Sequence, residues 1–200
     1  LDLDANTAAP SMDRGDDPTR AAAHLMGSGA RVRGDIDSLT AAAEQVVGTD
    51  AHLAVELTDR ATSLTVEPSR RLSVVRARAL STVGRVGEAE ALIHLLLADA
   101  VGDEQAVLRR DLAMSYFHQG RAGETVAVLD TAAALAEDPV LTARLTADLA
   151  MAHLLAGQYG KAREVAADAA RRGEAVGDVT AVVAAEMVDL LIAWYQLDVS

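Results

Sequence analysis

The sequence predicts an all-α fold, an α-solenoid in which antiparallel helix pairs stack on one another. The first observation is a repeat: glycines recur at intervals of 36, 36 and 37 residues, at Gly48, Gly84, Gly120 and Gly157. The second is an alanine seven residues before each of them, at Ala41, Ala77, Ala113 and Ala150. The third is composition, since half of the chain is hydrophobic but only 2% is aromatic. Repeats of this length bury one face each, and stacked neighbours complete the core.

The glycine and the alanine mark two places on the first helix of each pair. Glycine is favoured where a helix ends and the chain reverses, because it accepts a positive φ. The alanine lies two turns earlier, where a larger side chain would hold the paired helix away. The two best copies are DLAMSYFHQGRAGETVAVLDTAA, from Asp111, and DLAMAHLLAGQYGKAREVAADAA, from Asp148. Weaker copies begin at Arg76 and near Thr40.

The repeats divide the chain into a leader and one domain. Residues 1–18 are polar, acidic and aperiodic, which predicts a flexible leader or linker. Residues 19–200 are expected to form a helical repeat domain that starts with a helix from Thr19 to about Met26. Its repeats are expected near 34–69, 70–105, 106–142 and 143–183, with a partial repeat at 184–200. Apolar spacing predicts helices near 36–47, 50–65, 70–83, 87–100, 103–119, 122–136, 140–156, 160–175 and 178–197, and no strand.

Charge and composition argue against several classes of function. The net charge of −12 disfavours direct binding to nucleic acid or to an anionic membrane, because both need clustered cations. No apolar stretch approaches the roughly 18 residues of a membrane span, and the N-terminal LDLDANTAAP lacks the features of a signal peptide. The absence of cysteine excludes disulfides and thiolate metal sites. We therefore expect a cytoplasmic location.

Motifs of catalysis and cofactor binding are also missing. A P-loop needs GxxxxGK followed by Ser or Thr, but the sequence around the single lysine, Lys161, reads GQYGKA. The histidines lack the spacing of metal ligands; they are His24, His52, His94, His118 and His153. We expect no cofactor, no metal and no enzymatic activity, and we expect His153 to serve in packing.

Two helix pairs resemble the tetratricopeptide repeat (TPR) at its signature positions. These positions are Leu112, Ala113, Tyr116, Gly120 and Ala132 in one pair, and Leu149, Ala150, Gly157, Ala162 and Ala169 in the next. The resemblance covers roughly residues 34–197 and implies a right-handed superhelix of TPR-like antiparallel helix pairs. The sequence departs from the pattern at Thr125, where alanine is usual, and at His153, where tyrosine is usual. A divergent relative of the repeat therefore stays open.

The order of segments shows a narrower resemblance. DPTRAAAHLMGSG, AAAEQVV, GRVGEAEALI and the repeated LA…G motifs look like the mid-region of the large ATP-binding LuxR-family regulators. In that family, helical repeats lie between an ATPase and a helix-turn-helix and sense an inducer or a partner. The resemblance implies a non-catalytic module of a bacterial transcription regulator that binds a small-molecule effector or a protein. A general protein-interaction scaffold, a helical domain of an enzyme complex and a homodimer stay open.

The candidate binding face lies on the inner surface of such a superhelix, which the first helix of each pair provides. Repeat positions on this surface mix cations with soft apolar groups and are Arg71, Arg78, Arg110, Met114, Phe117, His118, Arg144, Met151, Leu154, Tyr195 and Gln196. An acidic or amphipathic ligand, or a partner helix, would suit such a groove. Two alternatives remain. Met114, Met151 and Phe117 could pack against neighbouring helices, and the arginines could form a solvated face with local ion pairs.

Overall fold

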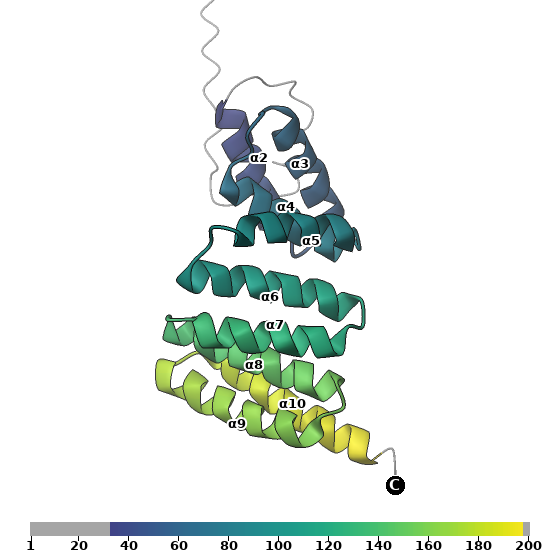
Figure 1. Cartoon of the computed structure of the whole chain (residues 1–200), viewed down its shortest axis with the longest axis vertical. Coiled ribbons are helices and arrows are strands. Elements are labelled where there is room, and N and C mark those ends of the chain that lie inside the picture. The colour runs from purple at the N-terminus through teal and green to yellow at the C-terminus, as the bar shows by residue number, and fades with distance from the viewer. Residues whose placement is uncertain (1–32, 198–200) are drawn as a thin grey trace, which may run out of the picture. The chain divides into compact units, whose positions relative to one another are not determined.

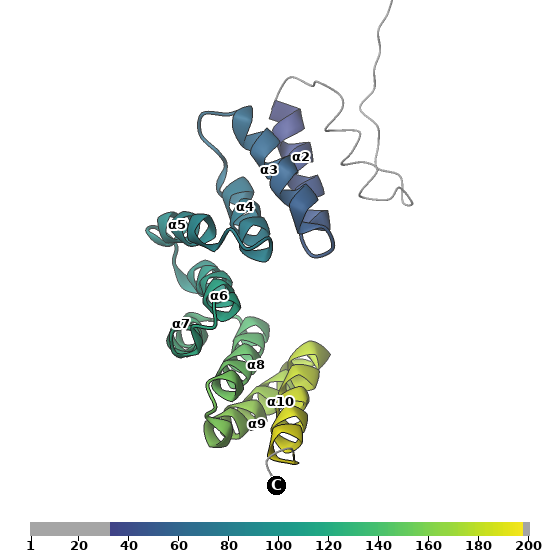
Figure 2. The same ribbon diagram turned by 90° about the vertical axis from the view of Figure 1, so that its right-hand side faces the viewer.

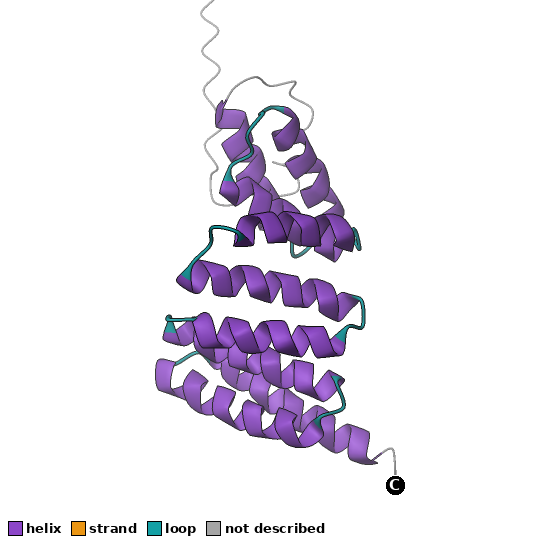
Figure 3. Ribbon diagram, viewed as in Figure 1, coloured by secondary structure: helices purple, strands orange, loops and turns teal. Residues whose placement is uncertain are grey.

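The computed structural model describes residues 33–197 of the chain. The expected leader at 1–18 and the expected helix from Thr19 to Met26 lie outside this range. Within it, Figure 3 shows helices joined by turns and no strand, as the sequence predicts. The chain divides into two compact units between Pro68 and Ser69, and each is described by itself. That residues 19–200 form one domain stays a prediction.

The first unit contains one antiparallel helix pair, α2 (Arg33–Val46) and α3 (Ala51–Ser63). Asp50 caps α3, because its side chain accepts a hydrogen bond of 3.0 Å from the backbone N–H of Leu53. Small and aliphatic side chains on both helices are buried between them: Leu39, Ala42, Ala43, Val46, Ala54, Leu57 and Ala61. Gly48 lies in the turn, but it is not among the glycines with a positive φ, so the turn chemistry expected from the repeat is wrong for this pair.

The second unit is a stack of helix pairs (Figure 1). The pairs are α4 (Arg70–Thr82) with α5 (Val86–Leu97), α6 (Gly102–His118) with α7 (Ala122–Leu135), and α8 (Pro139–Leu155) with α9 (Tyr159–Val176), followed by α10 (Val179–Leu197). Figure 2 shows the first helices of this unit, α4, α6, α8 and α10, on one side of the stack and the second helices on the other. Every observed helix begins and ends within three residues of its predicted bounds.

The turns within the pairs of the second unit have the predicted glycine chemistry. Gly84, Gly120 and Gly157 have φ values of 82°, 71° and 73°, the left-handed region that side-chain-bearing residues rarely adopt. The N–H of the residue after each glycine donates to the carbonyl five residues earlier. These bonds run from Arg85 to Leu80 (2.9 Å), from Arg121 to Tyr116 (3.0 Å) and from Gln158 to His153 (2.9 Å). This bond closes the end of the first helix and fixes the direction in which the second helix begins.

Small residues allow the helices of this unit to approach closely. Ala113 and Ala150 are 0% exposed, as expected of residues at helix contacts. The largest core surrounds α8 and contains, among its larger side chains, Leu129, Leu145, Val188 and Ile192. Gly173 marks a tight crossing of α9 and α10, because a Cβ atom there would lie 2.9 Å from Cγ2 of Val182. The crossing therefore fixes how α10 is rotated about its own axis.

Candidate binding site

Three of the predicted arginines form ion pairs that join a first helix to the next first helix or, for Arg144, to the residue just before α10. Each pairs with an aspartate of the following pair, and we call these contacts the ion-pair ladder. Its rungs are Arg78–Asp111 (2.8 Å), Arg110–Asp148 and Arg144–Asp178 (2.7 Å). The guanidinium groups are partly exposed but already neutralised. The structure therefore supports the interpretation of local ion pairs for these three residues, and it gives no reason to expect a strongly cationic groove.

The rungs of the ladder differ in their electrostatics. The Arg144 guanidinium donates to the carboxylate of Asp178 and holds its pKa below the usual range. Burial raises the pKa of Asp111, and the nearby Arg78 offsets only part of that effect. The pairing with Arg144 therefore lowers the pKa of Asp178, whereas burial outweighs the pairing with Arg78 and raises the pKa of Asp111.

Asp178→Asn is expected to lower the free energy of unfolding at neutral pH, because asparagine removes the charge while still capping α10 through its side-chain oxygen. The folded-state pKa of Asp178 is depressed, so its contribution is present above the unfolded pKa of about 3.9 and is lost as pH falls through the folded pKa. Urea unfolding at a series of pH values checks this. The exposed Asp130→Asn is the control, and an effect of Asp178→Asn that does not change with pH would contradict the charge argument.

The apolar members of the predicted face divide into two groups. Met114 and Phe117 are exposed on α6, and the His118 ring centroid lies 5.6 Å from that of Phe117. Met151 on α8 is half-buried and packs against the main core. Leu154 is buried, so its assignment to the binding face is wrong: it points into the core of the stack.

The remaining predicted residues lie away from these groups along the chain. Arg71 is exposed in the first turn of α4. Tyr195 is exposed near the end of α10, with its ring centroid 5.4 Å from that of Trp194. The side chain of Gln196 lies outside the described residues. Arg71 and Tyr195 do not line the hollow beside Phe117, and they lie on α4 and α10, outside the helices that form it.

An apolar hollow of about 220 Å³ lies beside Phe117. It is lined from three consecutive helices, α6, α7 and α8, and from the turn between the first two, by Phe117, Gly120, Ala122, Thr125, Ala152 and Leu155. Phe117 is 40% exposed and Leu155 is 44% exposed, so the rim of the hollow presents two large apolar side chains to solvent. The sequence analysis did not include Leu155 in the binding face. Leu155 is nevertheless the repeat equivalent of His118, which was included: each stands two residues before its turn glycine.

The chemistry of the hollow suits binding. Its lining contains no titratable side chain, and the one hydroxyl, of Thr125, donates to the backbone carbonyl of Arg121 at 3.0 Å.

Within residues 33–197, no group of three or more histidines and carboxylates is arranged to hold a metal ion. Over the same residues, no helix combines the length and the apolar character needed to cross a bilayer.

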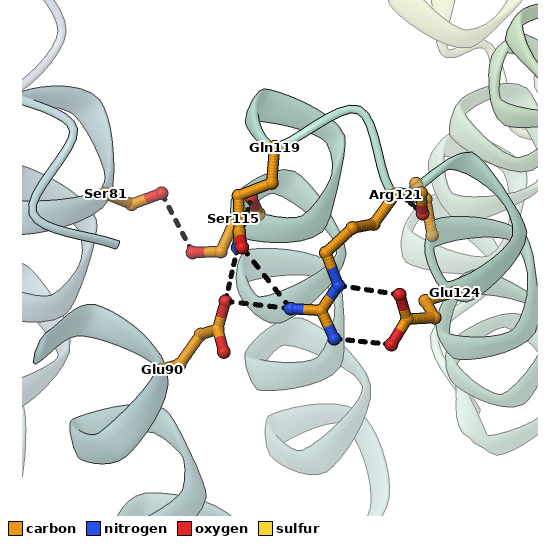
Figure 4. Close-up of polar contacts among 7 residues, drawn as sticks. Ser81, Glu90, Ser115, Gln119, Arg121 and Glu124 are labelled. Carbon is orange, nitrogen blue, oxygen red and sulfur yellow. Dashed lines mark hydrogen bonds and ion pairs between the residues drawn. The ribbon is translucent and has the colours of Figure 1, made fainter. Parts of the chain in front are cut away.

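A polar cluster joins two helix pairs next to this hollow (Figure 4). Arg121, at the start of α7, contacts Glu124 at 2.6 Å and Glu90 of α5 at 3.4 Å. Its guanidinium also lies 3.9 Å from the ring centroid of Tyr116, and it holds the pKa of Glu124 below the usual range. The sequence analysis missed the cluster. The motif Gly-Arg-x-Gly-Glu at 120–124 also occurs at 84–88, where Arg85 pairs with Glu88 at 2.7 Å, and this repetition was the available signal.

The two departures from the repeat pattern have local partners. The hydroxyl of the buried Thr125 donates a hydrogen bond to the backbone carbonyl of Arg121, one turn earlier on the helix. His153 is buried, and its Nδ1 lies 2.6 Å from Oε1 of Gln158, which follows the turn glycine. His153 therefore serves in packing, as the sequence analysis expected.

Comparisons with known proteins bear on the fold. No family model and no curated protein matches the sequence. The chain is similar to the TPR-like repeats of a kinesin light chain from Podosopora anserina, at 20% identity and a TM-score of 0.55 over 80% of this chain and 96% of that one. A single-residue variant of that protein gives a TM-score of 0.54 at the same identity and coverage. A likeness to MamA MSR-1 C2, at 15% identity, has a TM-score of 0.49, too low to support the assignment. The described chain is an all-helical, TPR-like solenoid.

Proposed function

We propose that the chain is a protein-interaction scaffold that binds a segment of a partner protein across α6 and α8. The observation that carries the proposal is the hollow between Phe117 and Leu155, in which large apolar side chains are exposed around a concave site. Met114 lies one turn before Phe117 on α6, and Met151 lies one turn before Leu155 on α8. Phe117, Leu155 and the exposed Met114 present apolar surface of the kind that accepts peptide segments, and the half-buried Met151 supports it from the core side.

The size of the hollow favours a protein partner over a small-molecule effector. Pockets that bind drug-sized ligands have volumes of about 300–1,000 Å³ and enclose most of the ligand. A hollow of about 220 Å³ that is open to solvent is large enough for one leucine, methionine or phenylalanine side chain. We therefore assign it the role of an anchor pocket within a longer contact.

The ion-pair ladder adds a constraint on the partner. Arg110 lies seven residues before Phe117 on α6, and Arg144 lies eleven residues before Leu155 on α8. Because Asp148 and Asp178 neutralise them, the face that runs along these helices from the hollow presents paired charges. Such a surface gives little advantage to a strongly acidic segment. The expected partner segment is therefore apolar at its anchor and mixed or neutral in charge on either side.

A peptide-library selection tests the proposal. Displayed peptides are selected on the full chain and then measured against purified Leu155→Ser, a change at an exposed position that leaves the core intact. We expect selected peptides to share one large apolar residue and to lose at least about tenfold in affinity on Leu155→Ser, since an apolar anchor contributes more than about 1.4 kcal/mol.

The matched control is Leu95→Ser on α5, the same substitution at a residue that is 73% exposed and does not line the hollow. Peptides should bind this variant as they bind the unmodified chain. If the selected peptides bind Leu155→Ser and Leu95→Ser equally well, the hollow is not the site.

The narrower role, as the sensing module of a LuxR-family transcription regulator, is proposed only on the sequence resemblance. The segment order from DPTRAAAHLMGSG to the repeated LA…G motifs supports it. Sequencing the coding region on both sides tests it, because the proposal requires a P-loop ATPase upstream and a helix-turn-helix downstream. A parent polypeptide without these two domains would leave the general scaffold as the function.

A further inference from the structure

Thr125 is the one lining residue of the hollow whose side chain carries a polar group. It stands in α7 where the neighbouring pairs hold alanine, at Ala89, 36 residues earlier, and at Ala162, 37 residues later. Both alanines are 0% exposed and Thr125 is 3% exposed, so the position is buried in all three pairs. Among these pairs, the threonine therefore adds a buried hydroxyl only where the hollow lies.

The hydrogen of this hydroxyl already has an acceptor. Oγ1 of Thr125 donates to the carbonyl of Arg121 at 3.0 Å, one turn earlier on the helix. A hydroxyl has one hydrogen and two acceptor lone pairs, so toward a bound side chain this oxygen can only accept. A side chain with a donor and no acceptor would satisfy the oxygen and bring no unpaired polar atom against the apolar walls.

The size of the hollow favours a large aromatic side chain. A cavity of about 150 Å³ is sufficient for benzene, whereas the hollow has a volume of about 220 Å³. A leucine or methionine side chain leaves part of this space unfilled and loses contacts with the walls. A bicyclic ring fills more of it, and Phe117 at the rim offers an aromatic partner for such a ring.

The corresponding place between α4 and α6 has different chemistry. Phe117 and Ala152 correspond there to Ser81 and Ser115, which are buried and hydrogen-bonded to each other at 2.9 Å (Figure 4). Two bonded hydroxyls replace the aromatic rim and the alanine wall. The match to an aromatic ring therefore lies between α6 and α8 rather than one repeat earlier.

We propose that the hollow selects a tryptophan of the partner segment, whose indole N–H donates to Oγ1 of Thr125. The indole is a bicyclic ring with one donor and no acceptor, whereas the phenol of tyrosine brings acceptor lone pairs of its own. This inference rests on the proposed function and adds to it the chemistry of the anchor residue and the residue that sets specificity, Thr125.

The test compares tryptophan with benzothienylalanine, an analogue in which sulfur replaces the N–H of the same bicyclic ring. Both are placed at the anchor position of the tightest selected peptide, beside versions with phenylalanine and leucine, and each peptide is titrated into the full chain. We expect the tryptophan peptide to bind tightest and to exceed the analogue by at least about threefold, as one neutral hydrogen bond contributes.

Variants of Thr125 test the source of this preference. Thr125→Val removes the hydroxyl and keeps the shape of the side chain, and the carbonyl of Arg121 still accepts from the backbone N–H of residue 125 at 3.0 Å. On this variant the tryptophan peptide should bind no tighter than the analogue, whereas Thr125→Ser should keep the preference.

Thr131→Val is the matched control, because Thr131 is exposed on the same helix and makes the same kind of bond, to the carbonyl of Ala127 at 2.9 Å. It does not line the hollow, so the preference for tryptophan should be unchanged in this variant.

Selected peptides that share leucine or phenylalanine at the anchor, yet lose affinity on Leu155→Ser, would keep the hollow as the binding site and overturn the tryptophan assignment. A preference that survives Thr125→Val, or that Thr131→Val also removes, would overturn the role of Thr125. Self-association of the chain that both Trp194→Phe and Leu155→Ser abolish would make a second copy the occupant and overturn the partner assignment. Failure of the proposed function is a separate result, namely equal binding to Leu155→Ser and Leu95→Ser.

Discussion

Leu145→Ala is expected to lower the free energy of unfolding by about 2–5 kcal/mol, the range for deleting a buried leucine side chain and leaving a cavity. Leu145 is fully buried on α8, in the largest core of the second unit. The surrounding core is rich in alanine, and alanine side chains are too short to collapse into the space. Urea unfolding followed by far-ultraviolet circular dichroism measures the change.

Leu155→Ala is the matched control for this change, because Leu155 lies on the same helix and is partly exposed at the hollow. It should cost less than about 1 kcal/mol, since little packing is lost at a surface position. Equal losses for the two variants would mean either that the hollow is closed in solution or that the core is not centred on α8.

Ala113→Leu and Ala150→Leu are each expected to destabilise the second unit by about 1–3 kcal/mol, because both alanines are fully buried at close helix contacts. A leucine at either position forces neighbouring side chains out of their rotamers or the paired helix outward. Thermal and urea unfolding of the single variants measure the effect.

Ala167→Leu provides the control for overpacking, since Ala167 is exposed on α9. Leucine is nearly as good a helix former as alanine, so this variant should unfold like the unmodified chain. Unchanged stability in Ala113→Leu and Ala150→Leu would show that the aligned alanines are not at tight contacts.

The fold could be predicted because its signals are local and repeated. The turn at Gly120 requires a residue that accepts a positive φ, and the helix contact at Ala113, seven residues earlier, requires a small one. Both requirements recur in each repeat, so the same residue types recur in the sequence at a constant interval. The same reasoning failed at Gly48, where the pair is the least regular copy of the repeat. Its turn forms without a positive φ at glycine.

The ion-pair ladder could not be read from the repeat. Its rungs join residues separated by 33, 38 and 34 positions, so a constant interval does not pair each arginine with its aspartate. The three arginines were selected for a binding face, which stays a prediction, and the structure places them on the first helices in ion pairs. Their partners depend on how one helix is rotated and shifted against the next, which is a property of tertiary packing.

Of the residues that line the hollow, the sequence analysis had selected only Phe117. Phe117 was selected by its repeat position, but Leu155 belongs to the wall only because α8 brings it opposite the end of α6. Leu154, one position earlier and equivalent to Phe117 in the repeat, is buried instead. Two equivalent repeat positions therefore differ in burial, because the packing around each helix end differs and the repeat does not specify it.

The ladder also has a mechanical consequence for the second unit. Its guanidinium groups are partly exposed, and ion pairs of that kind contribute little to stability because water screens them. The apolar contacts of the alanine-rich core therefore hold the helices together, and the ladder adds a preference for one alignment of charges along the stack. Loss of a single rung is expected to weaken the stack without unfolding it.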